Sequence, residues 1–208
     1  MSSGPFTPRP PFFPLPPVTP KPLSLADLIT PRTQPYIPPA VVEPKRPRIF
    51  VSYQHSSDQA YYDAFSKTFH DNYETIYDNS LERSIDSDNA EYVIQRIRDT
   101  FITGTSCTIL LVGPSSHERK YLDWEVKATL DKEHGLIGIH LPNLAPRWDG
   151  LFNVPLRFAD NVRSGYALWL HWNYVMGTPQ ELPALIETAC GHSKKLIINP
   201  KEIKKQNG

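Results

Sequence analysis

Prolines are concentrated at one end of this sequence: of the 22 prolines in 208 residues, 15 lie in the first 47. Proline has no backbone N–H and pushes the residue before it out of the helical region, so helices and internal strands are both disfavoured there. We therefore expect residues 1–46 to be an extended or disordered Pro-rich leader, interrupted by one apolar stretch at 23–29 that could dock on the domain or on a partner. The remaining residues, roughly 160, are enough for about one domain.

Charge, apolar run length and cysteine content exclude several classes of protein. Basic and acidic residues balance at 22 each, which lacks the basic footprint of a nucleic-acid-binding protein. The longest apolar runs, 107–113 and 136–141, are shorter than the ~18–20 residues that cross a bilayer, and prolines interrupt any secretory signal. The cysteines and histidines show no zinc-binding spacing. We expect a cytoplasmic, soluble protein that binds no metal, nucleic acid or membrane.

Beyond residue 47, short apolar segments alternate with segments of helical periodicity. Residues 107–112 are apolar almost throughout, which is typical of a central strand in a parallel sheet. Capping residues predict helix starts at Ser56 or Ser57, at Asp88 and at Ser115. Repeated strand–helix units predict an α/β fold with a doubly wound, mostly parallel five-stranded sheet. The expected strands are 49–53, 75–77, 107–112, 136–141 and 166–172, with an irregular stretch at 142–165, a last helix at 179–190, domain limits of 47–193 and a basic, frayed tail at 194–208.

Ligands of doubly wound sheets bind at the carboxyl ends of the strands. Four segments meet this condition here: 52–57, 78–88, 113–119 and 141–147. None of them carries a phosphate-binding GxxxxGK[ST] or GxGxxG motif, a GxSxG nucleophile elbow or an HExxH zinc motif. The sequence therefore disfavours a P-loop enzyme, a conventional dinucleotide fold and a serine hydrolase.

Glu125 is the candidate catalytic group that remains. Helical spacing places it one turn beyond Tyr121 and beside an apolar stripe, so it is expected to be partly desolvated at the carboxyl edge of the sheet. Physical reasoning alone favours a different interpretation, in which Glu125 is a surface glutamate paired with Arg119 or with the lysines at 127–132.

Two segments resemble TIR domains. Residues 48–53 read Arg-Ile-Phe-Val-Ser-Tyr and, with the aromatic-rich helix after them, resemble the first strand and helix of that family. Residues 119–126 read Arg-Lys-Tyr-Leu-Asp-Trp-Glu-Val and resemble the segment in which TIR-type NAD-cleaving enzymes carry their glutamate. Trp directly before Glu is most similar to the TIR-like domain of Thoeris antiphage signalling proteins. The resemblance covers residues 47–172 and departs from eukaryotic TIR adaptors, since the second loop here contains no proline.

The resemblance implies a flavodoxin-like TIR-type fold and a catalytic role for Glu125. The implied reaction is cleavage of the nicotinamide–ribose bond of NAD, with NAD as substrate and no separate cofactor. The product would be an ADP-ribose-derived second messenger, hydrolysed, cyclised or conjugated, that a separate effector protein senses in bacterial antiphage defence. A homo-oligomer would help to enclose the site. The alternative is a non-catalytic TIR module that acts by assembly, and a phosphoacceptor receiver fold is disfavoured because Gly113 stands where an aspartate is needed.

Five further residues are candidates for substrate binding by this resemblance. Ser52 and Tyr53 end the first strand, where nucleotide contacts gather in the family, or they are ordinary strand-end packing. Asp86, in the second loop, contacts substrate or a neighbouring subunit, or is a solvated acid. Arg119 neutralises a pyrophosphate or pairs with the aspartate one helical turn on. Trp124 is a ligand platform or a packing residue.

Overall fold

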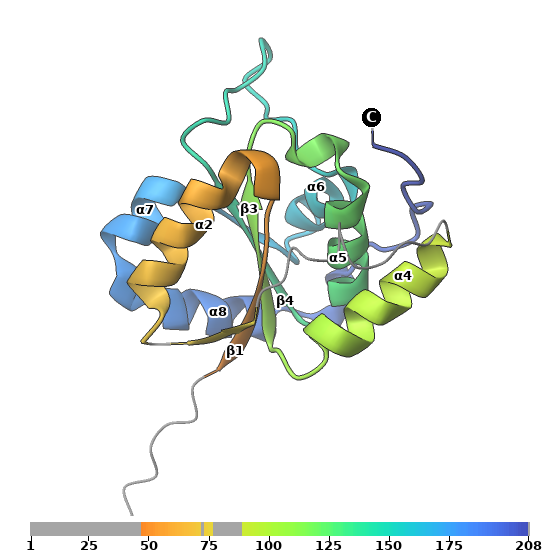
Figure 1. Cartoon of the computed structure of the whole chain (residues 1–208), viewed down its shortest axis with the longest axis horizontal. Helices are drawn as coiled ribbons and strands as arrows, with labels where there is room; N and C mark the ends of the chain where they lie inside the picture. Colours follow the sequence, from red (N-terminus) through yellow and green to blue (C-terminus); the bar gives the residue numbers. More distant parts are fainter. Residues whose placement is uncertain (1–46, 72, 77–88, 208) are drawn as a thin grey trace, which may run out of the picture. The chain divides into compact units, whose positions relative to one another are not determined.

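The computed structural model describes residues 47–71, 73–76 and 89–207 (Figure 1). The predicted leader at 1–46 and the second loop at 78–88, which carries Asp86, lie outside the described residues. Pro44–Gly208 forms one compact unit, so the C-terminal residues belong to the same body as the strands and helices before them.

The sheet has five parallel strands in the order β2-β1-β3-β4-β5. All six residues of the central strand β3 are buried, as its apolar sequence predicts. The predicted α/β class with a parallel sheet is confirmed, and the strand order is that of flavodoxin-like sheets. The strands are β1 (Arg48–Ser52), β2 (Glu74–Ile76), β3 (Cys107–Val112), β4 (Gly135–His140) and β5 (Leu168–His171).

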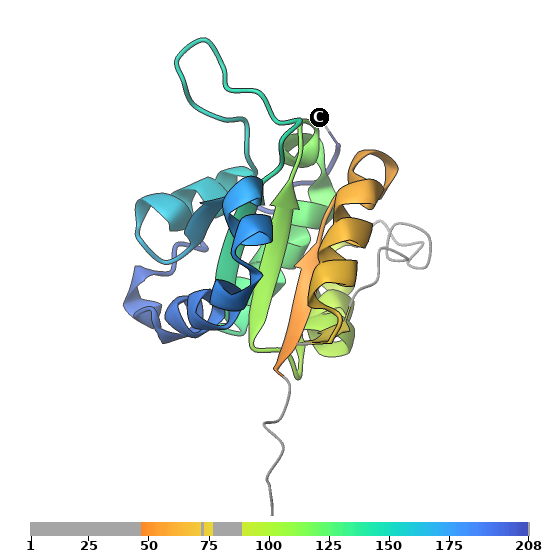
Figure 2. The ribbon, with the colours of Figure 1, turned by 90° about the vertical axis from the view of Figure 1, so that its left-hand side faces the viewer.

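Helices cover both faces of this sheet (Figures 1 and 2), because successive strand residues point to opposite sides and both sides are apolar. The face of Ile109 is covered by α2 (His55–Phe69), α7 (Trp172–Gly177) and α8 (Leu182–Gly191). The face of Phe50 and Leu110 is covered by α4 (Ala90–Ile97), α5 (Lys120–Asp131) and α6 (Leu156–Arg163). The π-helical turn η1 (Arg98–Ile102) and the 3-10 turns η2 (Ser116–Glu118), η3 (Pro179–Glu181) and η4 (Lys194–Leu196) complete the described elements. Among the described residues, no helix has both the length and the apolar character needed to span a bilayer.

Several predicted helix boundaries were wrong. Helix α2 begins at His55 with Gln54 as its N-cap, so neither predicted serine caps it. Asn89 caps α4, and its Oδ1 accepts a hydrogen bond from the Tyr92 N–H at 3.2 Å. A separate 3-10 turn follows Ser115, and α5 begins only at Lys120. The stretch predicted to be irregular contains α6, whose eight residues are too few for a clear periodic signal.

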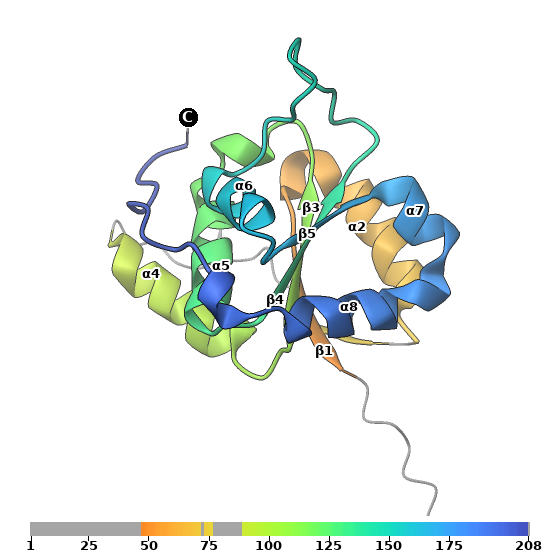
Figure 3. The same ribbon diagram turned by 180° about the vertical axis from the view of Figure 1, so that it is seen from behind.

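The C-terminal residues 194–207 run along α5 and α6 (Figure 3), so the expectation of a frayed tail was wrong. Asn161 of α6 exchanges two hydrogen bonds with the backbone of Ile198: Nδ2 donates to the carbonyl at 2.8 Å, and Oδ1 accepts from the N–H at 3.0 Å. Farther along, the Trp124 Nε1–H donates to the carbonyl of Lys204 at 2.8 Å. These side chains satisfy the tail's backbone much as a neighbouring strand would, which fixes an otherwise irregular segment.

Candidate functional site

The site is positioned by the reversal of strand order next to β1. The chain runs from β1 outward to β2 and then returns to place β3 on the other side of β1. The connections that follow β1 and β3 therefore leave in opposite directions, and doubly wound sheets bind their ligands at such a reversal, at the carboxyl ends of the strands. Ser52 is the last residue of β1, and α5, which carries Glu125, follows β3.

Glu125 and Ser52 meet at this edge, inside the protein. The Ser52 hydroxyl donates a hydrogen bond to Glu125 Oε2, and the two residues are 0% and 2% exposed, respectively. The interpretation of Glu125 as a surface glutamate was therefore wrong, and Lys127 pairs instead with Asp131, with Nζ 3.0 Å from Oδ2. One turn along α5, the Thr129 hydroxyl donates to the Glu125 carbonyl at 2.8 Å and lies 2.7 Å from the hydroxyl of Thr108 on β3. A buried polar seam thus fixes the face of α5 that holds Glu125 against the sheet.

Asp58 is a second buried carboxyl group at the same edge, and sequence reasoning missed it. It lies in the first turn of α2, fully buried, with its carboxyl group packed so closely on Gly113 that a Cβ there would overlap it. Asn143 Nδ2 approaches Asp58 Oδ1 at 3.5 Å, whereas Oδ2 has no hydrogen-bond partner among the described residues. Burial raises the pKa of Asp58, and hydrogen bonds from Ser57 and Asn143 partly oppose the shift. An aspartate in a first helical turn usually signals only a favourable helix dipole, so its burial had no clear sequence signal.

Asp58→Asn should raise the melting temperature near neutral pH. Because the folded-state pKa is raised, the stabilisation due to this carboxyl is complete below its unfolded pKa, about 3.9, and is lost as the pH rises through the folded pKa. The gain from asparagine should therefore disappear at acidic pH. Thermal unfolding of both proteins across this range tests the expectation, with exposed Asp63→Asn on the same helix as the control. A gain that does not change with pH would contradict it.

Tyr53 and Arg119, two predicted substrate-binding residues, lie near this edge with different surroundings. Tyr53 is buried, donates its hydroxyl hydrogen to Gln59 Oε1 at 2.8 Å and stacks on Tyr62 with ring centroids 4.5 Å apart. Arg119 is half-buried at the N-cap of α5, and among the described residues its Nε has no hydrogen-bond partner. The suggested pairing of Arg119 with Asp123 was wrong, because Asp123 binds a different arginine, as described below. Arg119 is therefore available to an anionic ligand.

Trp124 occupies the core between α4 and α5. It is buried with Phe50 and Ile94, makes an edge contact with Tyr121 at a centroid distance of 5.0 Å, and donates its indole N–H to the C-terminal segment. The structure therefore places Trp124 in a packing role. Asp86, the remaining candidate, lies outside the described residues.

A comparison with known protein families identifies the segment that carries this site. Residues 50–146, from β1 to the loop after β4, match the family model of the Thoeris protein ThsB, TIR-like domain. These residues are a ThsB-type TIR-like domain. The match contains Ser52, Asp58 and Glu125, so these buried polar residues all lie in the family segment. A search of curated proteins found no match.

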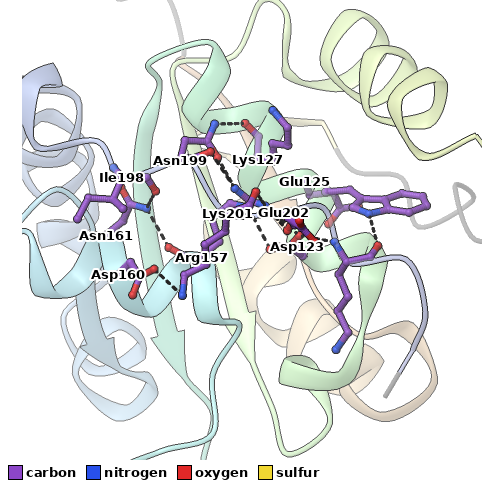
Figure 4. Close-up of polar contacts among 12 residues, drawn as sticks. Asp123, Glu125, Lys127, Arg157, Asp160, Asn161, Ile198, Asn199, Lys201 and Glu202 are labelled. Carbon is purple, nitrogen blue, oxygen red and sulfur yellow. Dashed lines mark hydrogen bonds and ion pairs between the residues drawn. The ribbon is translucent and has the colours of Figure 1, made fainter.

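The TIR-like domain is joined to the C-terminal segment by a buried ion pair next to Glu125 (Figure 4). Arg157 on α6 donates from Nε to Asp123 Oδ1 at 3.1 Å and from Nη2 to Asp123 Oδ2 at 3.3 Å. The same guanidinium also donates to Asn199 Oδ1 at 2.6 Å and to the carbonyls of Asn199, Lys201 and Glu202 at 3.1–3.3 Å. Asp123 precedes Glu125 by two residues, so this network fixes the turn of α5 that carries the candidate catalytic group.

Among the described residues, no group of three or more His, Cys, Asp or Glu side chains is arranged so that it could hold a metal ion. Cys107 and Cys190 are both free thiols.

Proposed function

We propose that this chain is an NAD-consuming enzyme of Thoeris antiphage defence that acts in the cytoplasm. It cleaves the nicotinamide–ribose bond with Glu125 and makes an ADP-ribose-derived second messenger. The observation that carries the proposal is the buried Glu125 carboxyl, held by Ser52 at the strand-order reversal of a ThsB-type TIR-like domain.

A single carboxylate is sufficient for this reaction. Breaking the bond to nicotinamide develops positive charge on the ribose, as in glycoside cleavage. Glycosidases need a second acid to protonate the leaving group, whereas nicotinamide departs from a positively charged pyridinium and leaves neutral without one. Glu125 stabilises the developing cation, and its burial strengthens this interaction because few water molecules screen it. NAD is thus the substrate, and no separate cofactor is required.

Ser52 and Arg119 have supporting roles in this proposal. The Ser52 hydroxyl fixes the orientation of the Glu125 carboxyl group. Arg119, the N-cap residue of α5 and six residues before Glu125, offers a guanidinium to the pyrophosphate. Because Glu125 is almost fully buried, NAD can reach it only if neighbouring side chains move, or if the site rearranges when a second subunit binds.

The second candidate function is that of a non-catalytic TIR module acting by assembly with signalling partners. One observation favours it: Trp148, in the loop after β4, is 94% exposed, and tryptophan is enriched among the residues that dominate protein interfaces. In the enzymatic proposal the same loop contacts a second subunit in a homo-oligomer. The separate effector protein then binds the messenger and does not contact this loop.

Purified protein incubated with NAD, with and without lysate of phage-infected cells, tests the proposal. We expect release of nicotinamide together with an ADP-ribose derivative, both resolved by mass spectrometry. The mass of the derivative identifies the group that captures the cation, namely water, another atom of the substrate or a second molecule. Unchanged NAD in both incubations would contradict the enzymatic proposal and favour the assembly module.

A further inference from the structure

A cavity of about 600 Å³ lies under the loop that follows β4, between this loop, α6 and β5. We call it the α6 cavity. None of Ser52, Asp58 and Glu125 lines it, so it is distinct from the buried site that contains these three residues. Its volume is within the range of small-molecule sites, roughly 300–1,000 Å³.

The floor of the α6 cavity is aromatic and already in place. Phe158 of α6 packs against the sheet so closely that a Cβ at Gly138 would overlap its ring. Trp169 of β5 lies beside it, with ring centroids 5.5 Å apart, and Phe152 of the loop contacts Trp169 at 6.3 Å. Rings fixed by the sheet need little rearrangement on binding, which favours a flat aromatic ligand over a flexible aliphatic one.

The charged residues at the cavity are all basic. Arg147 and Arg163 line it, together with the polar His117 and Asn153, and none of the described residues that line it is acidic. Arg147 Nη2 lies 2.9 Å from Asp149 Oδ2, and Arg163 Nη1 lies 2.8 Å from Asp160 Oδ1, but both arginine side chains are exposed to solvent. Exposed ion pairs contribute little stability, so either guanidinium can turn to a ligand anion at small cost.

From this combination we infer that the α6 cavity binds a small molecule in which a planar aromatic ring is joined to an anionic group. The ring lies on the partly exposed rings of Phe152 and Trp169, which pack over the buried Phe158, and the anion is bound by Arg147 and Arg163. A nucleoside phosphate and a free aromatic acid share this chemistry. The inference does not depend on NAD cleavage at Glu125.

A matched pair of fluorescent probes tests the inference. The sulfonate 8-anilinonaphthalene-1-sulfonate carries rings and an anion, whereas N-phenyl-1-naphthylamine has the same rings without charge. We expect the folded full-length protein to bind one equivalent of the sulfonate more tightly than the neutral probe, with added salt weakening only the sulfonate. Equal affinity for both probes would overturn the inference.

Two variants locate the bound probe. Val162→Trp fills the cavity from α6 and should abolish binding of the sulfonate. The double variant Arg147→Gln, Arg163→Gln should weaken the sulfonate roughly tenfold, equivalent to about 1.4 kcal/mol, without affecting the neutral probe. The control is Lys67→Gln, Arg96→Gln, which removes the same charge from α2 and α4. Only variants whose melting temperature equals that of the wild type are compared. Sulfonate binding that survives Val162→Trp would overturn the inference. An equal loss of sulfonate binding in the control variant would also overturn it.

Competition identifies the source of the ligand. Displacement of the sulfonate by ADP indicates a nucleotide, and displacement by indole-3-acetate indicates a free aromatic acid. Either result supports the cavity's assignment, whereas retention of the sulfonate against both would count against it.

Discussion

Glu125→Gln should lower the rate of NAD cleavage by ~10²–10³-fold, the usual loss when one comparable electrostatic stabiliser of a transition state is removed. Glutamine keeps the shape of the side chain and an oxygen that can accept the Ser52 hydrogen bond. It removes only the negative charge that meets the developing cation. Because the wild-type carboxylate is buried at a desolvation cost, the melting temperature should stay the same or rise slightly. Nicotinamide release and thermal unfolding, measured on the same preparation, test both parts.

The control is Glu187→Gln on the exposed side of α8, which makes the same chemical change on a different helix and should leave the rate unchanged. NAD cleavage by Glu125→Gln within about threefold of wild type would refute the catalytic assignment. The same variant separates the two candidate functions in cells challenged with phage. A non-catalytic assembly module would still protect cells that carry Glu125→Gln, whereas an enzyme would not.

The strands were the most predictable part of the fold. A strand buried on both faces of a parallel sheet must be apolar at nearly every position, and β3 and β4, buried along their whole length, meet this condition except at Thr108 and His140. The parallel arrangement also followed, because repeated strand–helix units favour a parallel sheet covered by helices on both faces. The family resemblance rested on residues of β1 and α5, and the matched segment 50–146 contains the last three residues of β1 and all of α5.

Helix ends were less predictable because many residues can cap a helix. Ser56, Ser57 and Ser115 all have side chains that can cap a helix. However, α2 begins at His55 with Gln54 as its N-cap, and α5 begins at Lys120 with Arg119 as its N-cap. The short-range signal of a cap contributes only ~1 kcal/mol, which tertiary contacts can exceed.

The site was predictable only in part. Phe50 and Ser52 are two residues apart in β1, so their side chains point to the same face of the sheet, which α5 covers. A contact between Ser52 and Glu125 is therefore consistent with strand and helix periodicity. Asp58 was missed because its burial depends on Gly113, 55 positions later, and on Asn143. The sequence left Trp124 as either a ligand platform or a packing residue; adjacent helical residues point in different directions, and its ring packs on α4.

Arg157→Met should lower the free energy of unfolding by about 3–5 kcal/mol, the usual cost of removing one partner of a buried ion pair. The Arg157 side chain is 0% exposed, and its guanidinium donates to Asp123 and to three carbonyls of the C-terminal segment. Methionine fills much of the same space but leaves the Asp123 carboxylate and these carbonyls without their donor. Urea denaturation followed by circular dichroism measures the loss.

Arg163→Met is the matched control for Arg157→Met, because it makes the same change on the same helix where the side chain is 71% exposed and pairs with Asp160. It should cost no more than about 1 kcal/mol. Adding Asp123→Leu to Arg157→Met removes the stranded carboxylate and should restore part of the lost stability. Since Asp123 lies two residues before Glu125, the single variant should also lower NAD cleavage through movement of α5, and the double variant should recover stability more than rate. If Arg157→Met costs no more than Arg163→Met, the buried guanidinium is not what holds the C-terminal segment to α5.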